Sequence, residues 1–321
     1  MGIPKLNSYL LNNCSKHSID KKHLSSFAGK TIVVDTSIYL YKFAATDCII
    51  ESFYQMILIF KYYNITPIFI FDGKPPDAKK ALIYKRNDMK NDAETKQNTA
   101  EIEYEMLSKK HNKTDEEYNR LDAIKILINN LKKQCVRVSW DDSYRVRCLL
   151  TLCNIEYYNA KGEADELCAH MVLTKKAWAC MSDDMDMFVY GCTRVMRGFN
   201  LHNNTVIFYN INGILRDLDL TMTDFRKIAV LSGTDYNIDQ YIDIVDVLKH
   251  YNLYKKSVDI DVDFYEWYSN TKNIEIDDDK LRDIYNMFSS NCVSIPPKSN
   301  CIANKHTTIY EFLRPYGFVF A

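Results

Sequence analysis

Residues 65–73, with the sequence Ile-Thr-Pro-Ile-Phe-Ile-Phe-Asp-Gly, decide the class of fold. The stretch is short and apolar, and Asp72-Gly73 ends it, which is typical of a strand buried on both faces. A similar stretch, Thr31-Ile32-Val33-Val34-Asp35, precedes it. Residues 49–63 lie between the two and are long enough for a helix that crosses from one strand to the next. The pair therefore predicts a parallel strand–helix–strand unit.

Further strands and helices are expected along the chain. Residues 155–158, 177–181 and 206–209 read as strands, separated by segments of helical length. Thr114 with Glu117 forms a capping box that opens a helix. After Gly162, apolar residues follow helical spacing and predict a helix that packs on the sheet: Ala164, Leu167, Cys168, Met171 and Val172. We predict an α/β fold with a mainly parallel sheet and helices on both faces.

The segment from Lys74 to Asn112 has a different composition. It is rich in Lys, Glu, Asp and Asn, and has no Gly. Residues 74–137 carry fifteen Lys or Arg and eleven Asp or Glu, a local excess of four positive charges. On composition alone this is a solvated helical insertion. From Leu215 onward the chain is helix-rich and more acidic, with Asp259, Asp261 and Asp263 in alternation, and its terminal aromatics are expected to dock on the body.

The overall composition narrows the class of protein. The 321 residues are 47% hydrophobic and 26% charged, with 41 Lys or Arg and 42 Asp or Glu. That balance excludes a disordered or collagen-like chain, and a nucleic-acid partner would need a local patch. The ten cysteines include no C-x-x-C pair, which argues against structural zinc and favours a reduced intracellular compartment, nucleus or cytoplasm. No secretory signal layout and no membrane-spanning run is seen.

Acidic residues follow the predicted strands at the point where each strand ends. The carboxyl ends of parallel strands meet in one crevice, so these side chains are expected to converge. Two more acids open the helix after Gly162, and one follows Gly233. Singly, each is more often a turn or helix-cap residue. The full set is Asp35, Asp72, Glu163, Asp165, Asp184, Asp186 and Asp235.

Converging carboxylates predict bound cations. Two of them about 4 Å apart repel by roughly 4 kcal/mol at an effective dielectric constant of about 20. A few such pairs would rival the net stability of a domain, which is about 5–15 kcal/mol. Oxygen ligands without His or Cys indicate Mg²⁺, with Mn²⁺ as a possible substitute, and two such ions suit phosphodiester hydrolysis.

Six short motifs stand out, and five of them contain these acids. They are Met1-Gly2-Ile3, Val34-Asp35-Thr36-Ser37, Phe71-Asp72-Gly73-Lys74-Pro75-Pro76, Glu163-Ala164-Asp165-Glu166-Leu167-Cys168-Ala169, Ser182-Asp183-Asp184-Met185-Asp186 and Leu231-Ser232-Gly233-Thr234-Asp235-Tyr236. Together they resemble the motifs of the flap endonuclease (XPG-like) family, in the family's order, and the resemblance covers about residues 1–240. The resemblance implies a PIN-like fold with a helical arch over the site.

The resemblance also implies roles for individual residues. Asp35, Asp72, Glu163 and Asp165 would form one group of metal ligands, and Asp184, Asp186 and Asp235 a second. Lys79 and Arg86 would contact the scissile phosphate and stabilise its developing charge. Tyr41 would stack on a base, and Gly2 and Lys74 join the residues expected to contact DNA. Without the motifs, Lys79 is a surface lysine and Tyr41 a core tyrosine.

The sequence departs from the family's pattern in places. Asp165 replaces a Glu, which shortens that arm. No Gly occurs between Gly233 and Gly317, where the family has a Gly-rich helix–two-turn–helix that holds duplex phosphates. Residues 237–244 occupy this position instead, so the sequence leaves open whether this segment binds duplex DNA. No sliding-clamp motif or basic tail is found, which is similar to relatives in large DNA viruses and allows a viral replication site.

These observations give one hypothesis and two alternatives. We expect a two-metal, structure-specific 5′ nuclease acting on branched or flapped DNA in replication, repair or recombination. The expected organisation is residues 1–110 as the N-terminal region, an arch over about 74–130, an internal region at 131–240 and a helix-rich region at 241–321. A non-catalytic nucleic-acid-binding scaffold and a metal-dependent ribonuclease on a related sheet are the alternatives. Substrate preference and oligomeric state are left open.

Overall fold

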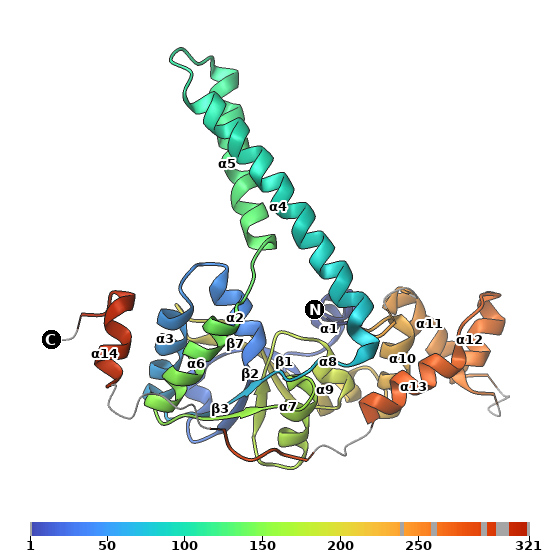
Figure 1. Cartoon of the computed structure of the whole chain (residues 1–321). Coiled ribbons are helices and arrows are strands. Elements are labelled where there is room, and N and C mark those ends of the chain that lie inside the picture. The colour runs from blue at the N-terminus through green and yellow to red at the C-terminus, as the bar shows by residue number, and fades with distance from the viewer. Residues whose placement is uncertain (1, 238–240, 258–261, 290–293, 300–307, 320–321) are drawn as a thin grey trace.

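The computed structural model describes residues 2–237, 241–257, 262–289, 294–299 and 308–319. Its fourteen α-helices over these residues alternate with strands in the first two thirds of the chain and follow one another thereafter (Figure 1). The helices are α1 Leu6–Asn13, α2 Thr36–Ala44, α3 Ile49–Tyr62, α4 Lys80–Ser108, α5 Asp115–Gln134, α6 Trp140–Leu152, α7 Ala164–Leu173, α8 Asp186–Val189, α9 Ile211–Asp217, α10 Met222–Ser232, α11 Ile244–Tyr254, α12 Phe264–Lys272, α13 Asp278–Ser289 and α14 Ile309–Leu313.

The strands form one seven-stranded sheet in the order β1-β7-β6-β5-β2-β3-β4. Their bounds are β1 Ile19–His23, β2 Thr31–Asp35, β3 Thr66–Phe71, β4 Glu156–Asn159, β5 Ala179–Met181, β6 Arg194–Asn200 and β7 Thr205–Asn210. Strands β4, β3, β2, β5 and β6 are parallel, and β7 and β1 add two antiparallel pairings at one edge. The carboxyl ends of the parallel strands therefore lie along a common edge.

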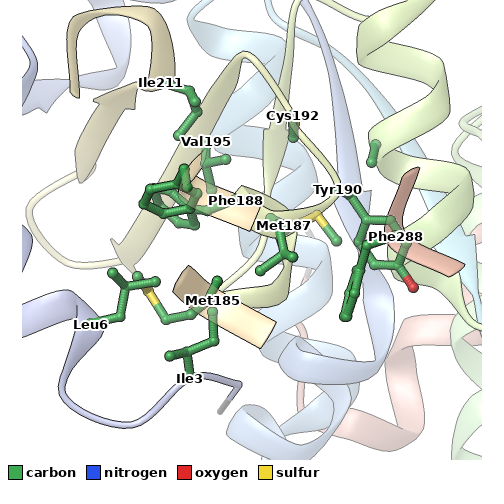
Figure 2. Packing of buried hydrophobic residues seen from close by; sticks show 14 of the residues in the cluster. Ile3, Leu6, Met185, Met187, Phe188, Tyr190, Cys192, Val195, Ile211 and Phe288 are labelled. Carbon is green, nitrogen blue, oxygen red and sulfur yellow. The ribbon is translucent and has the colours of Figure 1, made fainter. Parts of the chain in front are cut away.

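Helices cover both faces of the sheet, and each face has its own core. One core joins the sheet to α1, α7, α8, α10 and the C-terminal helices, and Figure 2 shows part of it around Met187 and Phe188. The other joins the sheet to α2, α3 and α6. The central strands are almost wholly inaccessible because both faces are covered, as their unbroken apolar sequences predict.

Helices α4 and α5 form a long hairpin that projects from the body (Figure 1). The hairpin has its own small apolar seam, built on Ala100, Ile124 and Ile128. Thr114 caps α5 through the capping box with Glu117 that its sequence predicts. The charged insertion is thus helical, as expected, and α5 continues to Gln134, four residues beyond the predicted arch.

The last described residues return to the body of the fold. The backbone N–H of Ser299 donates to the carbonyl of Tyr157 on β4, at 3.1 Å, which pairs part of that edge strand. Helix α14 lies beside α3 and α6 (Figure 1), and Leu313 is fully buried there. Among the terminal aromatics, Phe312, Tyr316 and Phe318 pack on this core, as expected. Phe320, Asp259 and Asp261 lie outside the described residues.

The predicted strands are all present, with bounds shifted by one or two residues. Strands β1 and β6 were not predicted, because β1 reads Ile-Asp-Lys-Lys-His and β6 contains two Arg and Gly198. The apolar stripe of α7 is buried, as its spacing predicts. No described helix combines the length and the apolar character needed to cross a membrane.

Candidate active site

The acids at the strand ends converge on one cavity of about 160 Å³. Asp35 is the last residue of β2, Asp72 follows β3, and Asp184 follows β5, so the parallel sheet brings three distant parts of the chain together. The cavity is lined by Asp35, Ser37, Ile38, Tyr41, Asp72, Lys79, Arg86, Glu163, Asp165, Asp184 and Asp235. Six of the seven predicted acids and both predicted cations therefore share one site.

Asp186 is the one predicted acid that does not line this cavity. Its side chain is buried, and neither carboxylate oxygen has a hydrogen-bond partner among the described residues. Its backbone N–H donates to Asp184 Oδ1 at 3.0 Å, which fixes the two acids relative to each other. Gly2 lies against both: a Cβ there would fall 2.5 Å from Asp184 Oδ1 and 2.6 Å from Asp186 Oδ1. Only Gly fits at this position.

Glu163 and Asp165 are placed by the start of α7, as the sequence predicts. Glu163 is the N-cap residue and Asp165 lies in the first turn. Asp72 Oδ1 accepts a 2.7 Å bond from the backbone N–H of Ala164, so the N-terminus of α7 holds Asp72 as well. Positively polarised amides at a helix start favour carboxylates, which explains why three acids gather there.

Burial and mutual repulsion disfavour ionisation of these acids. Burial, together with the carboxylates of Asp72 and Asp184, raises the pKa of Asp35 to about 7, although the hydroxyl of Ser182 opposes this. Burial likewise raises the pKa of Asp165 and Asp186 well above the ordinary value for Asp, and raises that of Asp184. Such a cluster is expected to be stabilised by added positive charge.

Two cations from the base of the hairpin lie among the acids. Lys79 Nζ lies 2.7 Å from Glu163 Oε1 and 3.7 Å from Asp235 Oδ2. Arg86 Nη2 donates to Asp235 Oδ2 at 3.0 Å. Burial lowers the pKa of Lys79, but Tyr236 and Glu163 raise it by more, so the ammonium stays charged. Both cations are placed to meet a phosphate that enters the cavity.

The donor set fits hard divalent cations. It consists of carboxylate oxygens without His or Cys, and it includes the two unpartnered oxygens of Asp186. In the part of the chain that the structure describes, no three His, Cys, Asp or Glu side chains already have the geometry of a formed metal site. Lys79 and Arg86 instead provide counter-charge to Glu163 and Asp235.

Two further residues, Tyr41 and Lys74, are predicted to contact DNA, and they differ in their position relative to the cavity. Tyr41 lines the cavity with its side chain 45% exposed, and Lys90 Nζ lies 4.7 Å from the centre of its ring. A half-exposed ring beside the acids can stack on a base. Lys74 is exposed and lies outside the cavity lining, with its backbone N–H bonded to the Lys161 carbonyl at 3.2 Å. Lys74 therefore does not line the cavity, and its contact with DNA stays a prediction.

Two further residues hold the acids, and sequence reasoning gave them no role. Ser182 Oγ donates to Asp35 Oδ2 at 3.0 Å and accepts from the backbone N–H of Asp184 at 3.1 Å. Tyr236 Oη donates to Glu163 Oε2 at 2.6 Å, and Lys79 Nζ lies 4.6 Å from its ring centre. Ser182 and Tyr236 each belong to a motif named in the sequence analysis and lie next to acidic residues in it. That position is the feature of the sequence that could have identified them.

Comparison with known proteins agrees with this geometry. Residues 1–93 match the model of the XPG N-terminal domain and residues 154–235 match the model of the XPG I-region. The chain is 28% identical to flap endonuclease 1 of Entamoeba histolytica over 284 residues, which cover 78% of this chain and 70% of that protein. It is also 28% identical to flap endonuclease 1 of Methanococcus aeolicus over 243 residues, which cover 69% and 68% respectively.

Solved structures share the fold. The catalytic core of Rad2 in complex with a DNA substrate matches with a TM-score of 0.62 at 20% identity, covering 91% of this chain and 88% of that one. The flap endonuclease-1 of Methanococcus jannaschii matches with a TM-score of 0.57 at 22% identity, covering 93% and 90%. With both family models matched and the acids of their motifs gathered in one cavity, the chain belongs to the flap endonuclease (XPG-like) family of structure-specific 5′ nucleases.

Proposed function

We propose that this protein is a Mg²⁺-dependent nuclease that hydrolyses a phosphodiester bond in branched DNA carrying a 5′ single strand. The observation that carries the proposal is the cavity in which six acids from five regions of the chain meet Lys79 and Arg86. That arrangement combines ligands for hard cations with fixed positive charge for a phosphate. A scaffold that only binds nucleic acid needs no such cluster of buried acids.

The proposed ligands are the seven acids named above, in the two groups that the motifs imply. When two divalent ions are bound, they supply the positive charge that makes a water nucleophilic and stabilises the leaving oxygen, and Mn²⁺ can replace Mg²⁺. Lys79 and Arg86 hold the scissile phosphate by charge. Tyr41 positions the neighbouring base by stacking, and Gly2 leaves room for close approach at Asp184 and Asp186.

The proposed selectivity for a 5′ single strand rests on the hairpin of α4 and α5. Its base carries Lys79 and Arg86, so a strand that reaches the cavity passes directly beneath it. Specificity would then come from shape and stacking rather than from contacts with base edges. We also propose an intracellular location, which the scattered cysteines of the sequence, without any C-x-x-C pair, favour.

A cleavage assay with matched variants tests the function. The substrates are a labelled 5′ flap, a nicked duplex and an RNA strand, each with Mg²⁺ or with EDTA. We expect Mg²⁺-dependent cutting of the flap, and its loss in Asp184→Asn and Asp165→Asn with folding and DNA binding retained. Glu166→Gln, which changes the neighbouring acid in the same turn of α7 but outside the cavity, is the matched control.

The outcomes separate the alternatives. Preferred cutting of the RNA strand would indicate the ribonuclease. DNA binding without cutting in any metal would indicate the scaffold. An Asp184→Asn variant that cuts the flap at the wild-type rate would show that the site is assigned wrongly.

A further inference from the structure

The loop from Ser182 to Asp186 carries two of the proposed metal ligands. The side chain of one arginine hydrogen-bonds to the backbone of this loop. Arg197, in the middle of β6, donates from Nη2 to the backbone carbonyl of Asp183 at 2.7 Å. The same guanidinium donates from Nη1 to Asn7 Oδ1 on α1 at 2.6 Å. One side chain therefore ties the loop to the sheet and to the N-terminal helix.

The environment of Arg197 is unusual for a structural arginine. Both Nη bonds go to neutral oxygens rather than to a carboxylate. Its Nε is buried and has no hydrogen-bond partner among the described residues. The guanidinium lies 5.7 Å from the ring centre of Tyr209, whose hydroxyl donates to the same Asn7 Oδ1 at 2.7 Å. Leaving a buried polar nitrogen of this half-buried side chain without a partner costs free energy, so stability alone does not explain the arrangement.

Helix α1 approaches the same loop from the other side. Met185, between the two proposed ligands, belongs to the core cluster that also contains Ile3 and Leu6, and Figure 2 shows the three side chains together. Just before α1, Gly2 lies against the carboxylates of the ligands that flank Met185. The N-terminal segment and the loop thus meet at two places. One is the apolar contact of Met185 with Ile3 and Leu6, and the other is the bridge from Asn7 through Arg197 to the Asp183 carbonyl.

We infer that Arg197 is a positioning residue that locks the loop of Asp184 and Asp186 to α1, with Asn7 as its coupling partner. Its hydrogen bonds reach Asn7 and the Asp183 carbonyl rather than a proposed ligand side chain, and it acts through that carbonyl. The inference rests on the proposed function, because it concerns the aim of proposed metal ligands. Partners one step behind the ligands typically change metal affinity or activity by about 10–100-fold when they are removed.

The planar fork of arginine is required for this role. Two Nη groups of fixed geometry reach two acceptors on different elements at once, whereas a lysine ammonium offers a single point of charge on a flexible stem. Arg197→Lys should therefore keep the charge and lose the bridge. Arg197→Met should lose both.

A matched control lies three residues away on the same strand. Arg194 is also half-buried, donates to a backbone carbonyl, that of Trp178 at 3.3 Å, and packs 4.9 Å from an aromatic ring centre. It is the first residue of β6, whereas the acids follow the carboxyl ends of the parallel strands. Arg194→Met removes one hydrogen bond to a carbonyl and one ring contact without touching the loop.

Two measurements on the full-length variants test the inference. The first is hydrogen exchange at the amides of Asp184 and Asp186 in metal-free protein, which reports the loop without any metal. The second is Mn²⁺ affinity, measured by electron paramagnetic resonance. In Arg197→Met we expect faster exchange at both amides and a dissociation constant raised about 10–100-fold. Arg197→Lys should show smaller changes than Arg197→Met in both the exchange rates and the Mn²⁺ affinity. Arg194→Met should match the wild-type protein in both measurements.

The contrary results are equally specific. Wild-type exchange and Mn²⁺ affinity in Arg197→Met would overturn the inference, as would equal losses in Arg197→Met and Arg194→Met. If Asn7→Ala and Arg197→Met act through one bridge, their effects should not add in the double variant, and additive effects would remove Asn7 from it. A wild-type protein that bound no Mn²⁺ would instead overturn the proposed function, and the exchange rates would still decide the role of Arg197.

Discussion

Lys79 Nζ lies 2.7 Å from Glu163 Oε1, with only 8% of the lysine side chain and 18% of the glutamate side chain exposed. The pair joins the base of the projecting hairpin to the start of α7, two elements that are far apart in the sequence. A charged ammonium is thereby fixed among the acids of the sheet edge. The ion pair therefore fixes the base of the hairpin to the proposed metal ligands.

The first prediction concerns that ammonium. Lys79→Met keeps most of the aliphatic stem and removes the charge, so the rate of flap cleavage under single-turnover conditions should fall by at least about 100-fold. Lys80→Met is the control, because Lys80 is exposed and its one ion pair among the described residues, with Asp77, is a surface contact of little energetic weight. Equal rates for the two variants would contradict the assigned role.

The second prediction concerns the unpartnered carboxylate of Asp186. Divalent cations should raise the melting temperature of the wild-type protein, because they bind the folded state and relieve repulsion among buried acids. Asp186→Asn should lose most of this rise and remain as stable as wild type in EDTA. Thermal unfolding with EDTA, Mg²⁺ or Mn²⁺ measures both. A variant that melted far below wild type in EDTA would show that Asp186 has a structural role instead.

The third prediction concerns the returning C-terminus. Leu313 on α14 is fully buried against the core of α3 and α6, so Leu313→Ala should lower the free energy of unfolding by about 2–5 kcal/mol. Val319→Ala, at a side chain that is 93% exposed, should change it by less than about 0.5 kcal/mol. Chemical denaturation measures the difference. The metal affinity of the folded Leu313→Ala protein should not change, because α14 is remote from the acids.

The fourth prediction concerns acid sensitivity of the C-terminal helices. Burial raises the pKa of Asp224, but a bond from the Tyr251 hydroxyl and the capping bonds of Thr221 lower it by more. Burial also raises the pKa of Asp263, and the Lys227 ammonium lowers it by more. Both carboxyls therefore have a pKa below their ordinary value in the folded protein.

The sign of the effect follows from this direction. A carboxyl with a lowered folded pKa stabilises the protein fully above its unfolded pKa of about 3.9, and that stability is lost as pH falls through the folded value. The melting temperature should fall as pH drops from about 3.9 to about 2.5, a range in which the site acids with raised pKa values are already protonated, and Asp224→Asn should flatten the slope. Glu275→Gln, at an exposed acid, is the control. An unchanged slope in Asp224→Asn would contradict the account.

Much of the fold was accessible from the sequence because its central strands are buried on both faces. Apolar runs such as residues 66–71 can be recognised without knowledge of their partners, and so can the capping box of α5. Strand β1 could not be recognised, since its sequence Ile-Asp-Lys-Lys-His has no apolar alternation and it pairs only with β7 at the edge. Strand β6 is interrupted by an irregularity between Arg197 and Asn200, with Gly198 at a φ of 61°.

Much of the composition of the candidate site could also be predicted from the sequence. Acids at the carboxyl ends of parallel strands had to converge, and the motifs named the two cations, so the cavity lining matches the prediction closely. The roles of Ser182 and Tyr236 depend on which atoms meet across the fold, which spacing along the chain does not specify. Lys74 was expected to contact DNA and lies outside the cavity, because the turn after β3 leaves it exposed. Residues 238–240, in the Gly-free segment, lie outside the described residues.

The most direct test is a crystal structure of the protein soaked in Mn²⁺, read from its anomalous scattering. If the acids hold two catalytic metal ions, we expect two Mn²⁺ peaks about 3.5–4 Å apart in the cavity. Oxygens of Asp35, Asp72, Glu163 and Asp165 would surround one peak, and those of Asp184, Asp186 and Asp235 the other. A cavity without any anomalous peak at saturating Mn²⁺, in a protein that cuts DNA, would contradict the claim that these acids hold the catalytic metal.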